Sequence, residues 1–368
     1  MNTENTPARP VKKILFVLFT PIGDVLFASP MIAGVRRAYP HAEITVAVNA
    51  AIGSFFDMSP DVDKILIIDP ARGPTDLQKF FAAVGSIRPH QYDIAIGISA
   101  ESNFYVAFSG ARKQIWQRLP VGFWLWGPLD DSYQRTHAVL HYWRIVARLG
   151  VFPQTAEDLI PKWSVPPSDT LQAQQIISAN GVTAAKDCPV IFLHPGAIGY
   201  GKLKRWPAEN FAALANRLID TLNAVIVVLG SHDDTEAETL IMEQTANRAI
   251  SLVGKTSLRM SIAAISLCDI YIGNDSGLTH FAVAMGKPTI ALFGVSNINQ
   301  FKPCAQNPEL LELLEPIPPR KPIGHFIGTE PLVWPKKFTP DNRMADISVD
   351  RVFASAMKLA ELRSVERK

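Results

Sequence analysis

The stretch that most constrains the fold of this chain is 268–294, CDIYIGNDSGLTHFAVAMGKPTIALFG. Two short apolar runs, Cys268–Ile272 and Thr289–Phe293, have the length and composition of buried parallel strands. Between them, helical spacing begins at Ser276, a natural N-cap residue, and stops at Gly286. This order of strand, turn, helix and strand predicts a βαβ unit in an open α/β sheet.

The turn of this unit, Gly273–Gly277, is expected to bind a ligand, because open α/β sheets hold ligands at the carboxyl ends of their strands. The N–H groups at a helix start favour an anion, most commonly a phosphate. Asp275 fits two interpretations. It either caps the helix or contacts the hydroxyls or amines of a ligand whose phosphate lies on the neighbouring N–H groups.

Length and composition narrow the class of protein. The chain has 368 residues, which predicts two domains, and a formal charge of +2 without a basic run, which argues against nucleic acid as the main partner. The apolar run at 14–19 is too short for a signal peptide or a membrane span, so we expect a cytoplasmic protein. Cys188, Cys268 and Cys304 are odd in number and widely spaced, which favours reduced thiols over disulfides or a metal site.

Apolar runs alternate with helical segments along the chain. The predicted strands are 13–19, 44–48, 65–68, 94–98, 190–193, 224–229, 250–253, 268–272 and 289–293. The proline-rich stretch Pro161–Pro167 reads as a linker, and the chain after Gly294 reads as proline-rich and irregular through Thr339. The pattern predicts two doubly wound parallel-sheet domains, at 1–165 and 166–345, and a closing helical segment at 346–368.

The segment 101–150 interleaves tryptophans and tyrosines with basic side chains. Such a stretch fits an acceptor-facing or membrane-facing surface, and it equally fits a mixture of core aromatics and solvated charges. Arg112 and Lys113 are its candidates for binding an acceptor.

A second glycine-rich turn, GAIGYGKL at 196–203, is one residue from a P-loop. Leu203 replaces the hydroxyl that a P-loop needs for magnesium, and the next helix starts only after Trp206 and Pro207, so we reject a P-loop NTPase. The turn can still hold phosphates through its backbone N–H groups and the cations beside it, Lys202, Lys204 and Arg205. No GxGxxG follows the first strand, which argues against a dinucleotide-dependent dehydrogenase.

Asp24 follows the first predicted strand and stands where a helix begins. A carboxylate there commonly complements the helix dipole. If two doubly wound domains face each other across a cleft, however, Asp24 looks toward Lys204 and Asp275. That arrangement suits group transfer, in which a base deprotonates the acceptor hydroxyl while a phosphate leaves.

Taken together, several motifs resemble those of a known family. They are ILFVLFTPIGDVLFASPMIAGVRRAYPHAEITVAV at 14–48, LHPGA at 193–197, KRWP at 204–207, LG at 229–230 and IGNDSGLTHFAVAMGKPTIALFG at 272–294. This set is similar to glycosyltransferase family 9, whose best-known members are the ADP-heptose:lipopolysaccharide heptosyltransferases. The resemblance implies a GT-B fold of two Rossmann-like domains, with the donor held by the C-terminal one and the closing helix returning toward the N-terminal one. It also implies an inverting transfer without a metal or other cofactor.

The resemblance also implies roles for individual residues. Asp24 would be the general base, with Gly23 beside it on the acceptor side, Lys204 would bind the donor diphosphate, and Asp275 would hold hydroxyls of the donor sugar. The further donor-side positions are Gly196, Ala197, Gly199, Tyr200, Ser276, Gly277, Leu278, Thr279 and His280. His280 is equally compatible with a buried core histidine.

The chain departs from the family pattern on the donor side. Gly199 and Tyr200 stand where members often carry a serine or threonine pair, and only Cys304 remains where members often carry several cysteines. The acidic ribose contact of some members has three candidates here, namely Asp233, Asp234 and Glu236.

The expected function is transfer of a sugar, heptose by resemblance, from an ADP-linked donor to a lipopolysaccharide-core or related glycan at the inner face of the cytoplasmic membrane. The alternatives are a non-catalytic nucleotide-sugar or glycan-binding protein and a nucleotide-sugar epimerase.

Overall fold

A computed structural model describes residues 10–71, 76–116, 136–182, 188–197, 201–318, 326–327, 330–331 and 343–366. The chain forms two compact units. The first unit takes the described residues within 1–20, 30–129 and 141–154, and the second takes those within 21–29, 130–140 and 155–368. The beginning of the first long helix is therefore grouped with the second unit.

The first unit is built on a five-stranded, fully parallel sheet in the order β3-β2-β1-β4-β5. Its strands are β1 (Lys13–Val17), β2 (Glu43–Val48), β3 (Lys64–Ile67), β4 (Ile94–Gly97) and β5 (Lys113–Trp116). Its helices are α1 (Ile22–Ala38), α2 (Ala50–Phe56), α3 (Leu77–Ile87), α4 (Ala100–Phe108) and α6 (Ala138–Val146), and the first residues of α1 and α6 fall in the second unit. The first four strands confirm the prediction, and β5 was not predicted.

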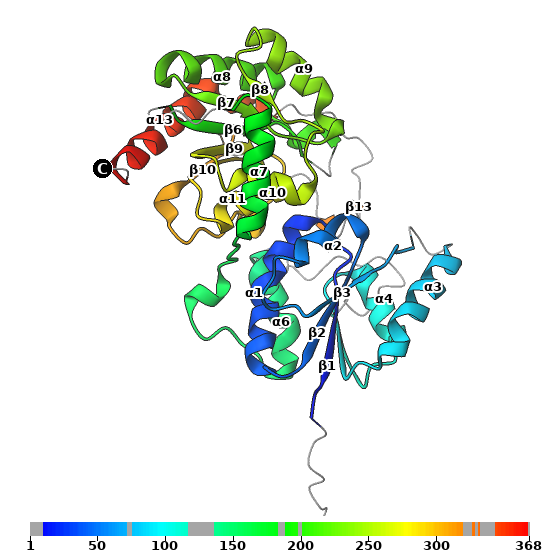
Figure 1. Ribbon diagram of the computed structural model, residues 1–368. Helices are drawn as coiled ribbons and strands as arrows, with labels where there is room; N and C mark the ends of the chain where they lie inside the picture. The colour runs from blue at the N-terminus through cyan, green and yellow to red at the C-terminus, as the bar shows by residue number, and fades with distance from the viewer. Residues whose placement is uncertain are drawn as a thin grey trace, which may run out of the picture. The chain divides into compact units, whose positions relative to one another are not determined.

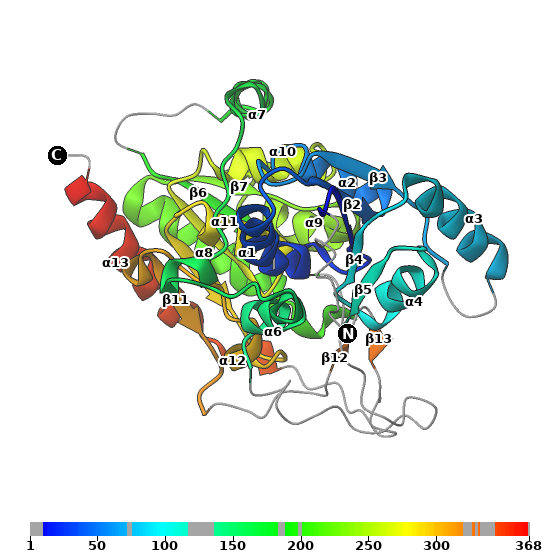
Figure 2. The ribbon, with the colours of Figure 1, turned by 90° about the horizontal axis from the view of Figure 1, so that it is seen from below.

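Helices cover both faces of this sheet. Figure 1 shows α1 and α6 on one face and α3 and α4 on the other. Ile14 to Val17 of β1 are fully buried, as expected for a strand covered on both sides. Helices α3 and α4 lie side by side, joined by the rings of Phe80 and Phe108, whose centroids are 5.4 Å apart (Figure 2).

The second unit is built on a six-stranded parallel sheet in the order β11-β10-β9-β6-β7-β8. Its strands are β6 (Val190–His194), β7 (Val225–Val228), β8 (Ile250–Ser251), β9 (Ile270–Asn274), β10 (Thr289–Leu292) and β11 (Leu311–Leu314). Its helices are α7 (Pro167–Ala179), α8 (Ala208–Leu222), α9 (Thr235–Gln244), α10 (Leu258–Ile265), α11 (Gly277–Ala284), α12 (Ile298–Phe301) and α13 (Val349–Glu366). The two parallel sheets confirm the predicted doubly wound α/β class. Helix α12 and strand β11 correct the expectation of an irregular segment after Gly294.

The closing helix α13 packs on the second sheet. Val352 and Leu359 of α13 share a buried core with Phe211 of α8 and Ile270 of β9. Arg363 adds an ion pair with Asp269, with 2.6 Å between Nη2 and Oδ2. The predicted return of this helix toward the first unit and the predicted domain boundaries stay predictions.

The segment predicted as a linker is packed within the second unit. The N–H of Trp163 donates to the carbonyl of Ala284 in α11 at 3.2 Å, and its ring meets Phe281 edge-on with centroids 5.5 Å apart. In the described part of the chain, no helix combines the length and the apolarity needed to cross a membrane.

Candidate active site

The order of strands in the second unit reverses between β6 and β9. From β6 the chain builds outward through β7 and β8, and it then crosses to β9, which pairs with the other side of β6, before adding β10 and β11. The carboxyl ends of β6 and β9 thus meet at a topological switch point, where open α/β sheets bind ligands. The two glycine-bearing turns singled out in the sequence lie there, and they begin at Pro195 and Asp275. Gly273 and Asn274, which were predicted as part of the second turn, are the last residues of β9.

Asp275 is the centre of a buried cluster. The Nζ of Lys204 lies 2.6 Å from its Oδ2, the hydroxyl of Ser296 donates to the same oxygen, and the Nε2 of His280 lies 3.5 Å from its Oδ1. Burial by itself would raise the pKa of Asp275, but the charge of Lys204 and then His280 hold that pKa well below its usual range. Because these partners are side chains, the carboxylate organises a polar cluster and does not act as a helix cap.

Asn274 ties three segments of the site together. Its side chain is fully buried, its Nδ2 donates to the carbonyl of Pro195 at 2.8 Å, and its Oδ1 accepts from the N–H of Trp206 at 2.9 Å. The indole N–H of Trp206 in turn donates to the carbonyl of Ile347 at 2.8 Å. Lys204 precedes Trp206 by two residues, so Asn274 helps to fix the segment that carries the lysine.

Replacing Asn274 by alanine is expected to lower the free energy of unfolding by about 2–4 kcal/mol, since a buried carbonyl and a buried N–H each lose their partner. Equilibrium unfolding in urea measures the loss. Asn299→Ala is the matched control, because Asn299 is exposed in α12 and surface substitutions change stability little. Equal stability of the two variants would contradict the tying role of Asn274.

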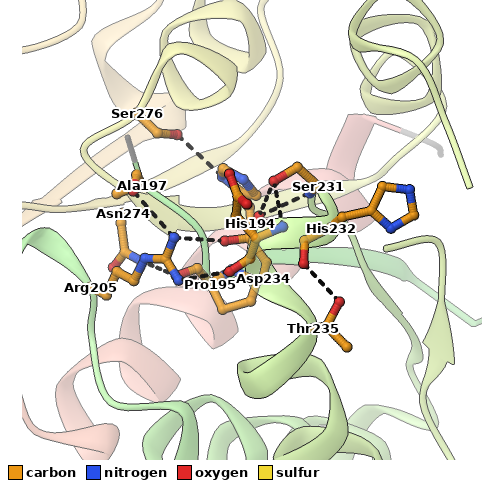
Figure 3. A network of polar contacts seen from close by, with 11 residues as sticks. His194, Pro195, Ala197, Arg205, Ser231, His232, Asp234, Thr235, Asn274 and Ser276 are labelled. Atoms are coloured by element: carbon orange, nitrogen blue, oxygen red, sulfur yellow. Dashed lines mark hydrogen bonds and ion pairs between the residues drawn. The ribbon is translucent and has the colours of Figure 1, made fainter. Parts of the chain in front are cut away.

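Ser276 takes the predicted N-cap position of α11, but its side chain makes no cap hydrogen bond. Its Oγ lies 3.2 Å from Nδ1 of His194 (Figure 3). It also lies 3.2 Å from Oγ1 of Thr279, whose hydroxyl donates to the carbonyl of Asn274 at 2.6 Å. Burial lowers the pKa of His194 to about 4, against the opposing influence of Asp234. At neutral pH the imidazole is therefore uncharged.

Asp234 and Arg205 form a second buried pair beside this group (Figure 3). Nη2 of Arg205 lies 3.0 Å from Oδ1 of Asp234, while both the N–H and the hydroxyl of Ser231 donate to Oδ2, at 2.9 and 3.1 Å. Both carboxylate oxygens of Asp234 thus have partners within the fold. The other two carboxylates considered for a ribose contact, Asp233 and Glu236, are exposed.

The start of α1 lies against the start of α11 within the second unit. A Cβ added to Gly23 would come within 3.3 Å of the His280 ring, and a Cβ added to Gly277 would lie 2.4 Å from Ile22. The ring of Phe27 meets that of His280 with centroids 4.6 Å apart. Asp24, the next residue after Gly23, lies in the first turn of α1 and is half-buried.

The other donor-side predictions fall on the same two turns. Gly196 approaches the carboxylate of Asp234 so closely that an added Cβ would lie 2.6 Å from Oδ2, and the carbonyl of Ala197 accepts from Arg205 at 3.4 Å. Leu278, Thr279 and His280 are buried in the first turns of α11. Gly199 and Tyr200 lie outside the described residues.

Arg112 and Lys113 belong to the first unit. They stand at the amino end of β5 in the first unit, where Arg112 pairs with Asp93, with 2.7 Å between Nη2 and Oδ1. Ligands of α/β sheets bind at the opposite, carboxyl ends of the strands. Their predicted acceptor-binding role stays a prediction.

The three cysteines are free thiols in the second unit. Burial raises the pKa of the Cys268 thiol to about 12, and Sγ of Cys304 lies 3.7 Å from Nε2 of His137. Within the ranges that the structure describes, no group of three or more His, Cys, Asp and Glu side chains is arranged to hold a metal ion.

Three polar residues at or near the site were given no role of their own in the sequence analysis: His194, Asn274 and Ser296. His194 and Asn274 are the last residues of β6 and β9, and Ser296 follows β10 by four residues. Their common signal is a polar side chain at or just after the carboxyl end of a buried strand, which could have drawn attention to all three.

Comparison with known proteins identifies the family. The sequence model of glycosyltransferase family 9 (heptosyltransferase) matches residues 117–320, more than half of the chain. The chain is 26% identical over 310 residues to lipopolysaccharide heptosyltransferase 2 of Escherichia coli K12, covering 82% of this chain and 88% of that protein. It is 30% identical over 305 residues to lipooligosaccharide heptosyltransferase 2 of Campylobacter jejuni serotype O:2, covering 82% and 87%.

The fold agrees with this relationship. The structure of E. coli ADP-heptose lipopolysaccharide heptosyltransferase II superposes with a TM-score of 0.73 at 24% identity, over 97% of this chain and 100% of that one. The family match favours an enzyme over the alternatives of a non-catalytic binding protein or an epimerase. The chain therefore belongs to glycosyltransferase family 9 and is a glycosyltransferase with two Rossmann-like sheets.

Proposed function

We propose that this enzyme transfers heptose from ADP-heptose to the core of a lipopolysaccharide, with inversion at the anomeric carbon. The observation that carries the proposal is the buried cluster of Lys204, Asp275 and Ser296 at the switch point of a family 9 fold. The names of the relatives support heptose as the sugar, and the E. coli structure described as an ADP-heptose enzyme supports the donor nucleotide.

In this proposal the donor diphosphate binds at the start of α11 and beside Lys204. The ammonium of Lys204 has three N–H donors, so its pairing with Asp275 is compatible with a further bond to a phosphate oxygen. The first-turn amides of α11 add the favourable end of the helix dipole. Both groups stabilise the negative charge that grows on the leaving diphosphate.

The acceptor hydroxyl is activated by Asp24. Its carboxylate takes the hydroxyl proton while the acceptor oxygen attacks the anomeric carbon, and the bond from that carbon to the diphosphate oxygen breaks, releasing ADP. The packing of Gly23 against Gly277 and His280 supports this role, because it brings the residue before Asp24 to the start of α11. We expect no metal or other cofactor to take part, and we expect the enzyme to work in the cytoplasm, in peripheral contact with the membrane that carries its acceptor.

Thermal-shift measurements with ADP, UDP and GDP test the donor. ADP is expected to raise the melting temperature most, since a ligand that binds only the folded state stabilises it, by about 2.7 kcal/mol at a hundred times its Kd. Transfer from ADP-heptose should persist in EDTA. A larger shift with UDP or GDP would overturn the donor assignment, and loss of activity in EDTA would overturn the metal-free mechanism.

A further inference from the structure

The side chain of Ser276 does not make the helix-capping hydrogen bond that other N-cap serines of this protein make. Ser99 and Ser257 are also N-cap residues, of α4 and α10, and each side chain accepts a hydrogen bond from the backbone N–H three residues ahead. Ser276 has nearly the backbone conformation of Ser99, with φ −148° and ψ 164° against −136° and 164°, yet its side chain makes no such bond. The backbone therefore does not explain the difference.

The difference lies in the partners of the side chain. The Thr279 hydroxyl donates to the carbonyl of Asn274, so in its 3.2 Å contact with Ser276 it can only accept. Ser276 then donates to Thr279, and the remaining 3.2 Å contact is a hydrogen bond from Nδ1–H of His194 to Ser276. This gives a directed chain from His194 through Ser276 and Thr279 to the end of β9. Figure 3 shows its first contact, between His194 and Ser276.

The environment of His194 fits this direction. The residue is 7% exposed and uncharged at neutral pH, so one ring nitrogen carries the proton and the other accepts. The phenol of Tyr271 is also buried, beside the Ser276 and Thr279 hydroxyls.

We propose that His194 is a positioning residue that holds the Ser276 hydroxyl off the first-turn amides of α11, so that these amides stay open to the donor diphosphate. The inference rests on the proposed donor site. A serine that is released from His194 is expected to rotate into the cap position that Ser99 and Ser257 occupy. The diphosphate would then have to displace it before binding.

A double-mutant cycle tests the inference, with ADP affinity measured by isothermal titration calorimetry. His194→Leu is expected to weaken ADP binding roughly tenfold, since one cap hydrogen bond must be broken. In a Ser276→Ala background, where no cap hydroxyl exists, the same substitution is expected to change affinity by less than about twofold. His194→Asn, which keeps an N–H near the place of Nδ1, is expected to restore most of the affinity.

Crystal structures of the variants separate this role from general loss of structure. In His194→Leu the Ser276 hydroxyl should lie within hydrogen-bond distance of the Leu278 or Thr279 N–H, and in His194→Asn it should not. An equal loss of ADP affinity in both backgrounds, or an uncapped helix in His194→Leu, would overturn the inference. If the native enzyme binds no ADP, the donor proposal fails, while the position of Ser276 in the His194→Leu structure still decides the role of His194.

Discussion

Replacement of Asp24 by asparagine is expected to reduce the rate of transfer about 10²–10⁴-fold, the usual contribution of a general base. The side chain keeps its shape, so ADP affinity should change by less than about twofold. The pH profile carries the sharper signature. The native kcat/KM should fall on the acid side as the carboxylate is protonated, and this limb should disappear in the variant.

The competing interpretation of Asp24 is a carboxylate that complements the dipole of α1, which is worth only about 0.3–1 kcal/mol of stability. Glu209→Gln is the matched control, because Glu209 is an exposed first-turn carboxylate of α8 and has no proposed role in the reaction. Asp24→Asn should retain the melting temperature of this control and lose the activity. If the two variants are equally active, the mechanism with Asp24 as base is wrong.

Most of the fold could be predicted because both sheets are parallel and covered on both faces. Strands such as β1 and β6 are buried along almost their whole length and read as continuous apolar runs. Within the two parallel sheets the missed strands are β5 and β11, which lie at sheet edges and are only partly buried. An edge strand needs less apolar surface, so its sequence signal is weaker.

Individual residues of the site could be predicted from the sequence, and the contacts between them could be predicted less well. The βαβ pattern placed Asp275 at a ligand turn, because strand, turn and helix are contiguous in sequence. The ion pair from Lys204 to Asp275 joins residues 71 positions apart and depends on β6 and β9 being neighbours. The choice between a cap and a polar cluster likewise depends on side-chain directions, which residue type alone does not determine.

Replacement of Lys204 by methionine is the second substitution with a large expected effect. It should change three separate quantities. The affinity for ADP should fall roughly 10- to 100-fold with the loss of a charged hydrogen-bond donor. The kcat should fall about 10²–10³-fold with the loss of stabilisation of the leaving diphosphate. The free energy of unfolding should fall by about 3 kcal/mol, because the buried carboxylate of Asp275 loses its closest cation.

The pH dependence of the free energy of unfolding tests whether the stability loss of Lys204→Met comes from the unpaired carboxylate of Asp275. In the native protein the pKa of Asp275 lies below its ordinary value of 3.8, so the ion pair stabilises the fold above that pH and is lost as the pH falls further. Without Lys204, burial is opposed less and the pKa of Asp275 rises. The stability deficit of Lys204→Met should therefore shrink as the pH is lowered from 7 toward about 4.

The double variant Lys204→Met/Asp275→Asn separates stability from catalysis. Removing both charges leaves no buried unpaired ion, so the free energy of unfolding at pH 7 should recover by most of the amount that Lys204→Met alone loses. ADP affinity and turnover should not recover, because the cation that neutralises the leaving group is still absent. Recovery of ADP affinity together with stability would mean that Lys204 only balances Asp275, and the diphosphate would then need another cation.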